Sequence, residues 1–369
     1  MKNQRWYFEF LAMPFTFGII GLLCFLSSES RADKFIDTSR IFYTINPEEF
    51  GASGSLFSLE QISSNPMVDV DPTTGAPDSE SKSGYITQVF QRILKNCHET
   101  MEKIDTLDTS DVGFYWAQVT GCLVVPYHES KLTHFRKILD LVNENDQSIC
   151  SLRMNNGQFL SGNKVLFGLF LNAFKEKNVV KECSSYEKGS SYIQLVGSSD
   201  SYSTGIMQIA MNWHGPHVMA GAHLSMDETL KYGLEKYLKA MNRLRTKVAS
   251  YPCLKMNKQV NYVNLIRSPW SGDYNAGNDS KSCRYSNPAD PWAQNDKSFM
   301  SDLNNFLGTV SLYSDGLTGE DLAIFQIIQS SMLYYQNLVS NTKKAGAATS
   351  SELESHRAAL MEYVGNINP

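Results

Sequence analysis

The chain has no excess of positive charge and no paired-cysteine motif. Its 369 residues carry 33 Lys and Arg against 38 Asp and Glu, which gives a net charge of −5. A protein that binds nucleic acid needs a basic face, so we expect no nucleic-acid partner. None of the seven cysteines forms a CxxC pair, so the sequence contains no zinc-ribbon motif.

Long apolar runs are also scarce, and the one candidate lies at the N-terminus. Lys2 and Arg5 precede an apolar stretch at 10–26. This stretch is shorter than the roughly 20 residues that a bilayer core requires, and small residues stand where cleavage after Ala32 needs them. We therefore expect residues 1–32 to be a signal peptide that directs the protein to the periplasm or the outside, with no stable membrane insertion afterwards. The alternative is an uncleaved membrane anchor.

Six cysteines remain when Cys24 of the expected signal peptide is set aside. An even number in an exported chain favours disulfides in an oxidising compartment. The sequence alone does not decide among the possible pairings. Pairing the cysteines that close local loops, and then the two that remain, suggests Cys150–Cys183, Cys253–Cys283 and Cys97–Cys122.

Composition and periodicity divide the rest of the chain into three regions. Residues 33–84 have weak periodicity and are rich in Ser, Gly, Pro and Asp toward their end, which indicates an extended arm or linker. Helical patterning then covers about 85–310, with a turn-rich insertion at about 143–192. Residues 311–369 contain amphipathic helices that we expect to pack on this domain as a C-terminal extension.

Hydrophobic periodicity predicts a mainly α protein with at most a small sheet. The best strand candidate is the segment 192–196. The expected helices cover 85–104, 112–123, 132–142, 165–177, 227–248, 296–307, 320–341 and 351–364.

Three short segments carry the functional signal, and about 75 and 65 residues separate them. We name them the acid, Met-Gln and Tyr-Asn segments. Each has an ordinary interpretation when taken alone: a solvated surface carboxylate, a buried turn and a surface turn. The segments are Glu129-Ser130, Gly205-Ile206-Met207-Gln208-Ile209 and Tyr274-Asn275-Ala276-Gly277.

Together the three segments suit a sugar cleft with one acid. A glycosidic bond breaks when its departing oxygen receives a proton, and a half-buried Glu such as Glu129 is the usual donor. The flexible thioether of Met207 can pack on a sugar face. The amides of Gln208 and Asn275 can bind hydroxyl and N-acetyl groups, and the phenol of Tyr274 can bond the acid or the substrate.

This combination resembles the superfamily of soluble lytic transglycosylases and goose-type lysozymes, over roughly residues 112–310 and with Ile206 in place of the usual Leu. The resemblance implies a lysozyme-like α+β fold with a helical catalytic domain. It implies a monomeric enzyme that cuts the β-1,4 bond between N-acetylmuramic acid and N-acetylglucosamine in peptidoglycan glycan strands, without metal or cofactor. It makes Glu129 the catalytic acid. The substrate-binding residues that it implies are Ser130, Met207, Gln208, Ile209, Tyr274 and Asn275.

Two departures from the family pattern bear on the exact substrate. The gap between the first two segments is longer than in the family, so an insertion must lie on or beside the cleft. Pro126 also stands close to the acid, in what should be a helix end. A wall with chemically modified glycan, for example de-N-acetylated strands, is a substrate that such changes could serve.

The reaction type is left open by the sequence. Lytic transglycosylases use the sugar's own 6-hydroxyl and leave 1,6-anhydro ends, whereas inverting hydrolysis needs a second carboxylate. Asp200, five residues before Gly205, is the candidate base, because goose-type lysozymes carry an Asp at a similar distance; Asp273 is a weaker candidate. We expect lysozyme-type hydrolysis. The alternatives are a lytic transglycosylase and a secreted glycan-binding protein that has lost the chemistry.

Overall fold

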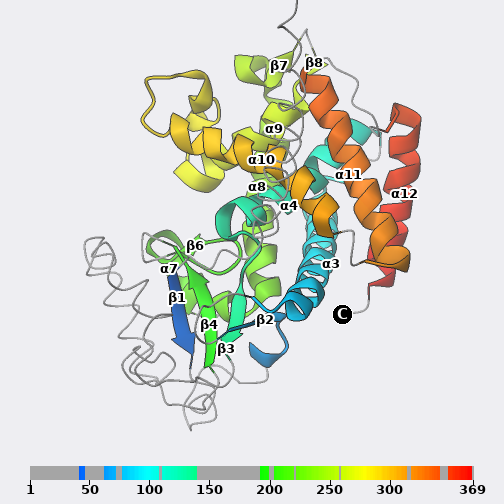
Figure 1. Cartoon of the computed structure of the whole chain (residues 1–369). Helices are drawn as coiled ribbons and strands as arrows, with labels where there is room; N and C mark the ends of the chain where they lie inside the picture. The colour runs from blue at the N-terminus through cyan, green and yellow to red at the C-terminus, as the bar shows by residue number, and fades with distance from the viewer. Residues whose placement is uncertain are drawn as a thin grey trace, which may run out of the picture.

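The computed structural model describes residues 41–45, 62–71, 77–107, 110–138, 192–198, 203–219, 222–256, 259–313, 317–340 and 348–367. These residues are mainly helical, with a small sheet at one side of the helices (Figure 1). No helix among them is long and apolar enough to cross a membrane. The α-helices are α3 (Ser79–Lys103), α4 (Val112–Ser130), α7 (Met211–Met219), α8 (Met226–Thr246), α9 (Tyr262–Pro269), α10 (Ala293–Tyr313), α11 (Gly319–Ser340) and α12 (Ser350–Asn366).

The main sheet has β4 at its centre. Strand β4 pairs antiparallel with both β1 and β3, while β2 pairs parallel with β3. Short strands β5 and β6 continue the sheet from the end of β4. The strand expected at 192–196 is confirmed by β4. The strands are β1 (Ile41–Ile45), β2 (Met67–Val70), β3 (Phe135–Ile138), β4 (Tyr192–Gly197), β5 (Ser203–Thr204) and β6 (Ile209–Ala210), and a separate pair is β7 (Lys255–Met256) with β8 (Gln259–Val260).

Helix α4 runs through the centre of the core and is buried on nearly every side. It begins at the N-cap Asp111, whose side chain accepts a hydrogen bond from the backbone N–H of Phe114. It ends where Lys131 takes a left-handed conformation with φ of 53°. A disulfide between Cys97 and Cys122 joins it to α3. This arrangement fixes the end of α4, and with it the acid segment, relative to the rest of the core.

One predicted helix is wrong, and the expected arm is partly folded. The segment expected as helix 132–142 contains strand β3, because residues 131 and 132 both have positive φ and β3 pairs with β2 and β4. Within 33–84, strands β1 and β2 belong to the sheet, and α3 starts at Ser79 because the Asp78 side chain caps it. The described parts of this region are therefore not a linker.

The C-terminal helices agree with the periodicity of the sequence. Helices α11 and α12 pack against the core, where the indole N–H of Trp116 donates to the Leu353 carbonyl at 3.1 Å. The suggested pairs Cys97–Cys122 and Cys253–Cys283 are both present. The signal peptide at 1–32, the pair Cys150–Cys183, the helix expected at 165–177 and nearly all of the insertion lie outside the described residues.

Candidate functional site

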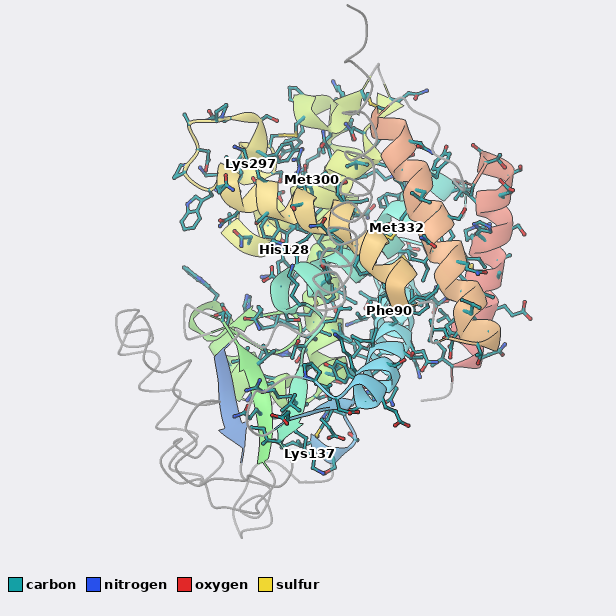
Figure 2. The ribbon with its side chains drawn as sticks, viewed as in Figure 1. Phe90, His128, Lys137, Lys297, Met300 and Met332 are labelled. Atoms are coloured by element: carbon teal, nitrogen blue, oxygen red, sulfur yellow. A yellow bond between two sulfur atoms is a disulfide. The ribbon has the colours of Figure 1, made fainter. Side chains whose placement is uncertain are left out.

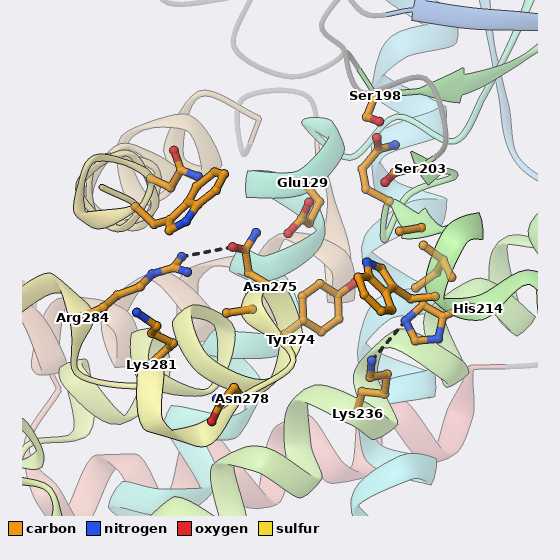
Figure 3. Close-up of a pocket in the computed structure, with 17 residues that line it drawn as sticks. Glu129, Ser198, Ser203, His214, Lys236, Tyr274, Asn275, Asn278, Lys281 and Arg284 are labelled. Atoms are coloured by element: carbon orange, nitrogen blue, oxygen red, sulfur yellow. Dashed lines mark hydrogen bonds between the residues drawn. The ribbon is translucent and has the colours of Figure 1, made fainter. Parts of the chain in front are cut away.

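One cavity brings the three sequence segments together. It has a volume of about 790 Å³ and lies between β5, β6 and α7 on one side and the chain that follows α9 on the other. Figure 3 shows Glu129, Tyr274 and Asn275 turned toward the same space. Five of the predicted site residues border this cavity, and they are Glu129, Gln208, Ile209, Tyr274 and Asn275.

Glu129 lies half-buried at the C-terminal end of α4. The indole Nε1–H of Trp270 donates a hydrogen bond to its Oε1 at 2.7 Å. Trp270 is 2% exposed and stacks on Phe299 with ring centroids 4.8 Å apart. The carboxyl of Glu129 is therefore oriented by a donor that packing holds in place.

A charged network supports the end of α4 behind Glu129. Asp302 of α10 lies 2.7 Å from His128 Nδ1 and accepts a hydrogen bond from Lys131 Nζ at 2.6 Å. Burial alone would raise the pKa of Asp302, but His128 and Lys131 outweigh it and hold this pKa below its ordinary value. The ring of His128, which Figure 2 places just below α10, meets Trp270 edge-on at 4.6 Å. Helix α10 thus holds the residues on both sides of the acid.

The Met-Gln segment forms a tight turn between β5 and β6. Gly205 and Gln208 both have positive φ, 75° and 46°, a conformation that glycine adopts most easily. The buried His134 accepts a hydrogen bond from the Ile206 N–H at 2.9 Å, and a Cβ added at Gly205 would lie 3.0 Å from the His134 ring. The Gln208 amide donates to the Gly205 carbonyl at 2.7 Å. The turn therefore presents the side chain of Gln208 to the cavity.

The Tyr-Asn segment begins at the end of the π-helical turn η8 (Trp270–Tyr274). The hydroxyl of Tyr274 donates to the carbonyl of Met207 at 2.5 Å, which ties this segment to the Met-Gln turn. Burial, followed by the negative charge of Glu129, holds the pKa of the Tyr274 phenol well above its ordinary value. Tyr274 therefore stays a proton-bearing donor at neutral pH and cannot act as a base there.

A buried ion pair supports the wall beside Asn275. The guanidinium of Arg284 donates to both carboxylate oxygens of Asp296 at 3.0 to 3.1 Å, and the two side chains are 2% and 0% exposed. Ser271 Oγ donates to the same carboxylate at 2.8 Å. Arg284 Nη2 also donates to Asn275 Oδ1 at 3.1 Å (Figure 3). The orientation of Asn275 thus depends on a charge pair anchored in α10.

Two of the expected site residues face the interior instead of the cavity. Ser130 is fully buried, and its Oγ donates to the Pro126 carbonyl at 3.0 Å. Met207 is also fully buried and packs on Gly233 of α8, where an added Cβ would lie 2.6 Å from its Cε. This corrects the expectation that both side chains line the cleft: they support its wall from behind.

The two candidate bases are not found in the described lining. Asp200 lies outside the described residues. Asp273 forms an ion pair with Arg243 at 3.4 Å and does not border the cavity. Among the lining residues that the structure describes, Glu129 is the one carboxylate.

The aromatic and basic side chains of the cavity were not predicted from the sequence. Trp213 and Trp292 border it and are 79% and 57% exposed. Lys236, Lys281 and Arg284 border it as well. The scarcity of tryptophan could have been the clue, because the chain has only five. Lysine and arginine are common on every surface and leave no comparable signal in the sequence.

The cavity combines one oriented carboxyl, hydrogen-bonding amides and exposed indoles, a set suited to binding and protonating a polyhydroxylated ring. Within the described part of the chain, no three His, Cys, Asp or Glu side chains converge as the ligands of a metal would. No family model, curated protein or solved structure matches this chain. Its function must therefore be inferred from the cavity and the residues around it.

Proposed function

We propose that this protein is an exported muramidase on a lysozyme-like fold, which cleaves the β-1,4 bond between N-acetylmuramic acid and N-acetylglucosamine in peptidoglycan with Glu129 as general acid. The main support is that three segments about 75 and 65 residues apart in the sequence meet at one cavity around a single oriented carboxyl. The exposed Trp213 and Trp292, which border the same cavity, offer flat apolar faces that suit pyranose rings. The two disulfides fit an oxidising compartment.

In the proposed reaction, Glu129 gives its proton to the glycosidic oxygen while the bond to the anomeric carbon breaks. The Trp270 N–H keeps the carboxyl in one orientation during this transfer. Tyr274 and Gln208 border the same space, and the bond from Tyr274 to the Met207 carbonyl holds them together. Substrate contacts are then made by side chains whose positions are set before binding.

The fate of the anomeric carbon distinguishes two versions of this proposal. In hydrolysis, Asp200 activates a water that attacks this carbon and produces a new reducing end. In transglycosylation, the 6-hydroxyl of the same sugar attacks, its proton passes to Glu129, and a 1,6-anhydro end results. The second version requires no carboxylate besides Glu129, which is the one that the described lining contains. The first version needs Asp200.

The test is digestion of purified peptidoglycan, followed by mass spectrometry of the fragment ends. Reducing ends support hydrolysis, and Asp200→Asn should then abolish activity; anhydro ends support transglycosylation, and Asp200→Asn should then be active. Glu129→Gln should lower the rate by a factor of at least about 100. Glu99→Gln, at an exposed site on α3, is the matched control and should leave the rate unchanged.

Full activity of Glu129→Gln would refute the proposed function. A wild-type protein that binds the glycan but releases no fragments would instead support the non-enzymatic alternative, a secreted glycan-binding protein.

A further inference from the structure

The described lining of the cavity has an excess of positive charge. It contains Lys236, Lys281 and Arg284 against the single carboxylate Glu129. Figure 3 shows Lys281 and Arg284 on one side of the cavity and Lys236 on the other. Each of these cations attracts anionic groups and repels cationic ones to the extent that no carboxylate beside it pairs with it.

The three cations differ in their partners. Lys281 forms an ion pair with Asp290 at 3.0 Å, and Arg284 is committed to the buried Asp296. The hydrogen bond of Lys236 goes to an imidazole: its Nζ lies 3.2 Å from His214 Nε2. Lys236 is thus the lining cation whose described hydrogen-bond partner carries no negative charge.

His214 is neutral at physiological pH. Burial, followed by the charges of Lys236 and His217, lowers its pKa to about 4. Its Nε2 must therefore accept from the Lys236 ammonium, so its Nδ1 carries the proton and donates to the Tyr232 hydroxyl at 2.8 Å. This chain of bonds fixes the position of the ammonium without neutralising it.

Burial is also the largest influence on Lys236, and it lowers the pKa of this ammonium; the charge of Asp273 opposes the effect. Asp273 is itself paired with Arg243 at 3.4 Å. No described carboxylate contacts the Lys236 ammonium directly. An anion that entered the cavity would therefore offset the cost of burying this charge.

An apolar platform adjoins the histidine that positions this ammonium. Trp213 precedes His214 on α7, is 79% exposed and borders the same cavity. A pyranose ring stacked on the indole could place a substituent near Lys236. The combination of a flat apolar face with a positioned cation suits a sugar that bears a carboxylate.

We propose that Lys236, positioned by His214, is a specificity-determining residue for glycan strands that carry carboxylates, and that the same residue disfavours strands that carry free amines. This inference rests on the proposed function. Two sources of the carboxylate share this chemistry, namely the lactyl ether of the sugar and an acidic peptide attached to it. In either case the contact is a charge-assisted hydrogen bond from the ammonium to a carboxylate oxygen.

The test measures binding by calorimetry in the Glu129→Gln background, so that no ligand is consumed. The ligands are peptide-free strands with free lactyl carboxylates, strands with stem peptides, de-N-acetylated strands, and a neutral N-acetylglucosamine oligomer. Adding Lys236→Met should weaken binding of one or both carboxylate-bearing ligands about 10- to 100-fold. Affinity for the neutral oligomer should stay within about twofold, because no charged contact is lost with this ligand. Retained affinity for this oligomer also shows that the variant is folded.

The pattern of losses identifies the source of the carboxylate. A loss on peptide-free strands indicates the lactyl group, and a loss confined to strands with stem peptides indicates the peptide. De-N-acetylated strands should bind Glu129→Gln more weakly than acetylated ones, and Lys236→Met should reduce this difference. Lys236→Arg should retain most of the affinity, and the loss with Lys236→Met should shrink at high salt. Lys239→Met is the matched control, because this exposed lysine of α8 pairs with Glu235 at the surface.

Equal affinities of the Lys236→Met and parent proteins for every ligand would overturn the inference and leave the proposed function standing. An equal loss on the neutral oligomer would also overturn it, because charge would then not be the cause. If Glu129→Gln bound none of the glycans while wild type released no fragments, the proposed function would fail as well.

Discussion

Breaking the ion pair between Arg284 and Asp296 by removing one partner should destabilise the protein strongly and disturb the candidate site. Both side chains are buried, 2% and 0% exposed, and three donor contacts at 3.0 to 3.1 Å join them. Among the described residues, Arg284→Met leaves the buried Asp296 carboxylate with the Ser271 hydroxyl as its side-chain hydrogen-bond partner. Removal of one member of such a pair costs about 3–5 kcal/mol, because the remaining charge stays out of water.

Removing both charges should restore most of this loss. The double variant Arg284→Met with Asp296→Asn keeps a polar acceptor for Ser271 and has no buried charge. Its free energy of unfolding should be only about 1–2 kcal/mol lower than that of wild type. This difference comes from the lost hydrogen bonds and from the lost contact of the guanidinium with the Trp270 ring at 5.7 Å. The coupling between the two sites should therefore exceed about 1 kcal/mol.

Urea unfolding of wild type, both single variants and the double variant measures these free energies. Lys239→Met is the control, because this lysine is 55% exposed in its pair with Glu235 and such surface pairs contribute about 0–1 kcal/mol. A cost below about 1 kcal/mol for Arg284→Met, or a double variant less stable than both singles, would refute the reasoning. Both Arg284 variants should also lose peptidoglycan cleavage, since Asn275 loses its hydrogen bond from Arg284.

Three further predictions concern the tryptophans and one buried histidine. Trp270→Phe removes the hydrogen-bond donor to Glu129 and should lower kcat about tenfold or more. Trp116→Phe is the control: it also removes one buried indole hydrogen bond, but it should lower stability alone. Equal kcat values in the two variants would contradict this prediction. Trp213→Ala and Trp292→Ala should each weaken binding of a glycan oligomer about 3- to 10-fold in calorimetry, and unchanged affinity in the double variant would remove both from the site. Burial lowers the pKa of His134 from 6.5 to about 3. As pH falls below 6.5, this histidine therefore takes up a proton in the unfolded chain but stays neutral in the folded protein, and stability falls until pH reaches about 3. His134→Asn should flatten this fall by up to about 1.4 kcal/mol per pH unit, measured by urea unfolding between pH 7 and pH 4, and an unchanged slope would count against the assignment.

The long helices were predictable because their periodicity extends over many residues. Helix α8 and the C-terminal helices have a regular apolar stripe, and the strand β4 has a short apolar run with β-branched residues. The segment that forms β3 has an equally helical local pattern, but pairing with β2 and β4 overrides it. Those partners are remote in the sequence, so no local rule could include them.

The acid and the two amides of the candidate site were predictable from the sequence, because Glu129, Gln208 and Asn275 stand in short, recognisable chemical patterns. Which side chains reach the cavity depends on packing that those patterns do not contain. Met207 faces α8, while Trp213 remains in solvent and borders the cavity. Exposure and charge pairing depend on elements packed together from distant parts of the chain, as the bond between Trp270 and Glu129 illustrates.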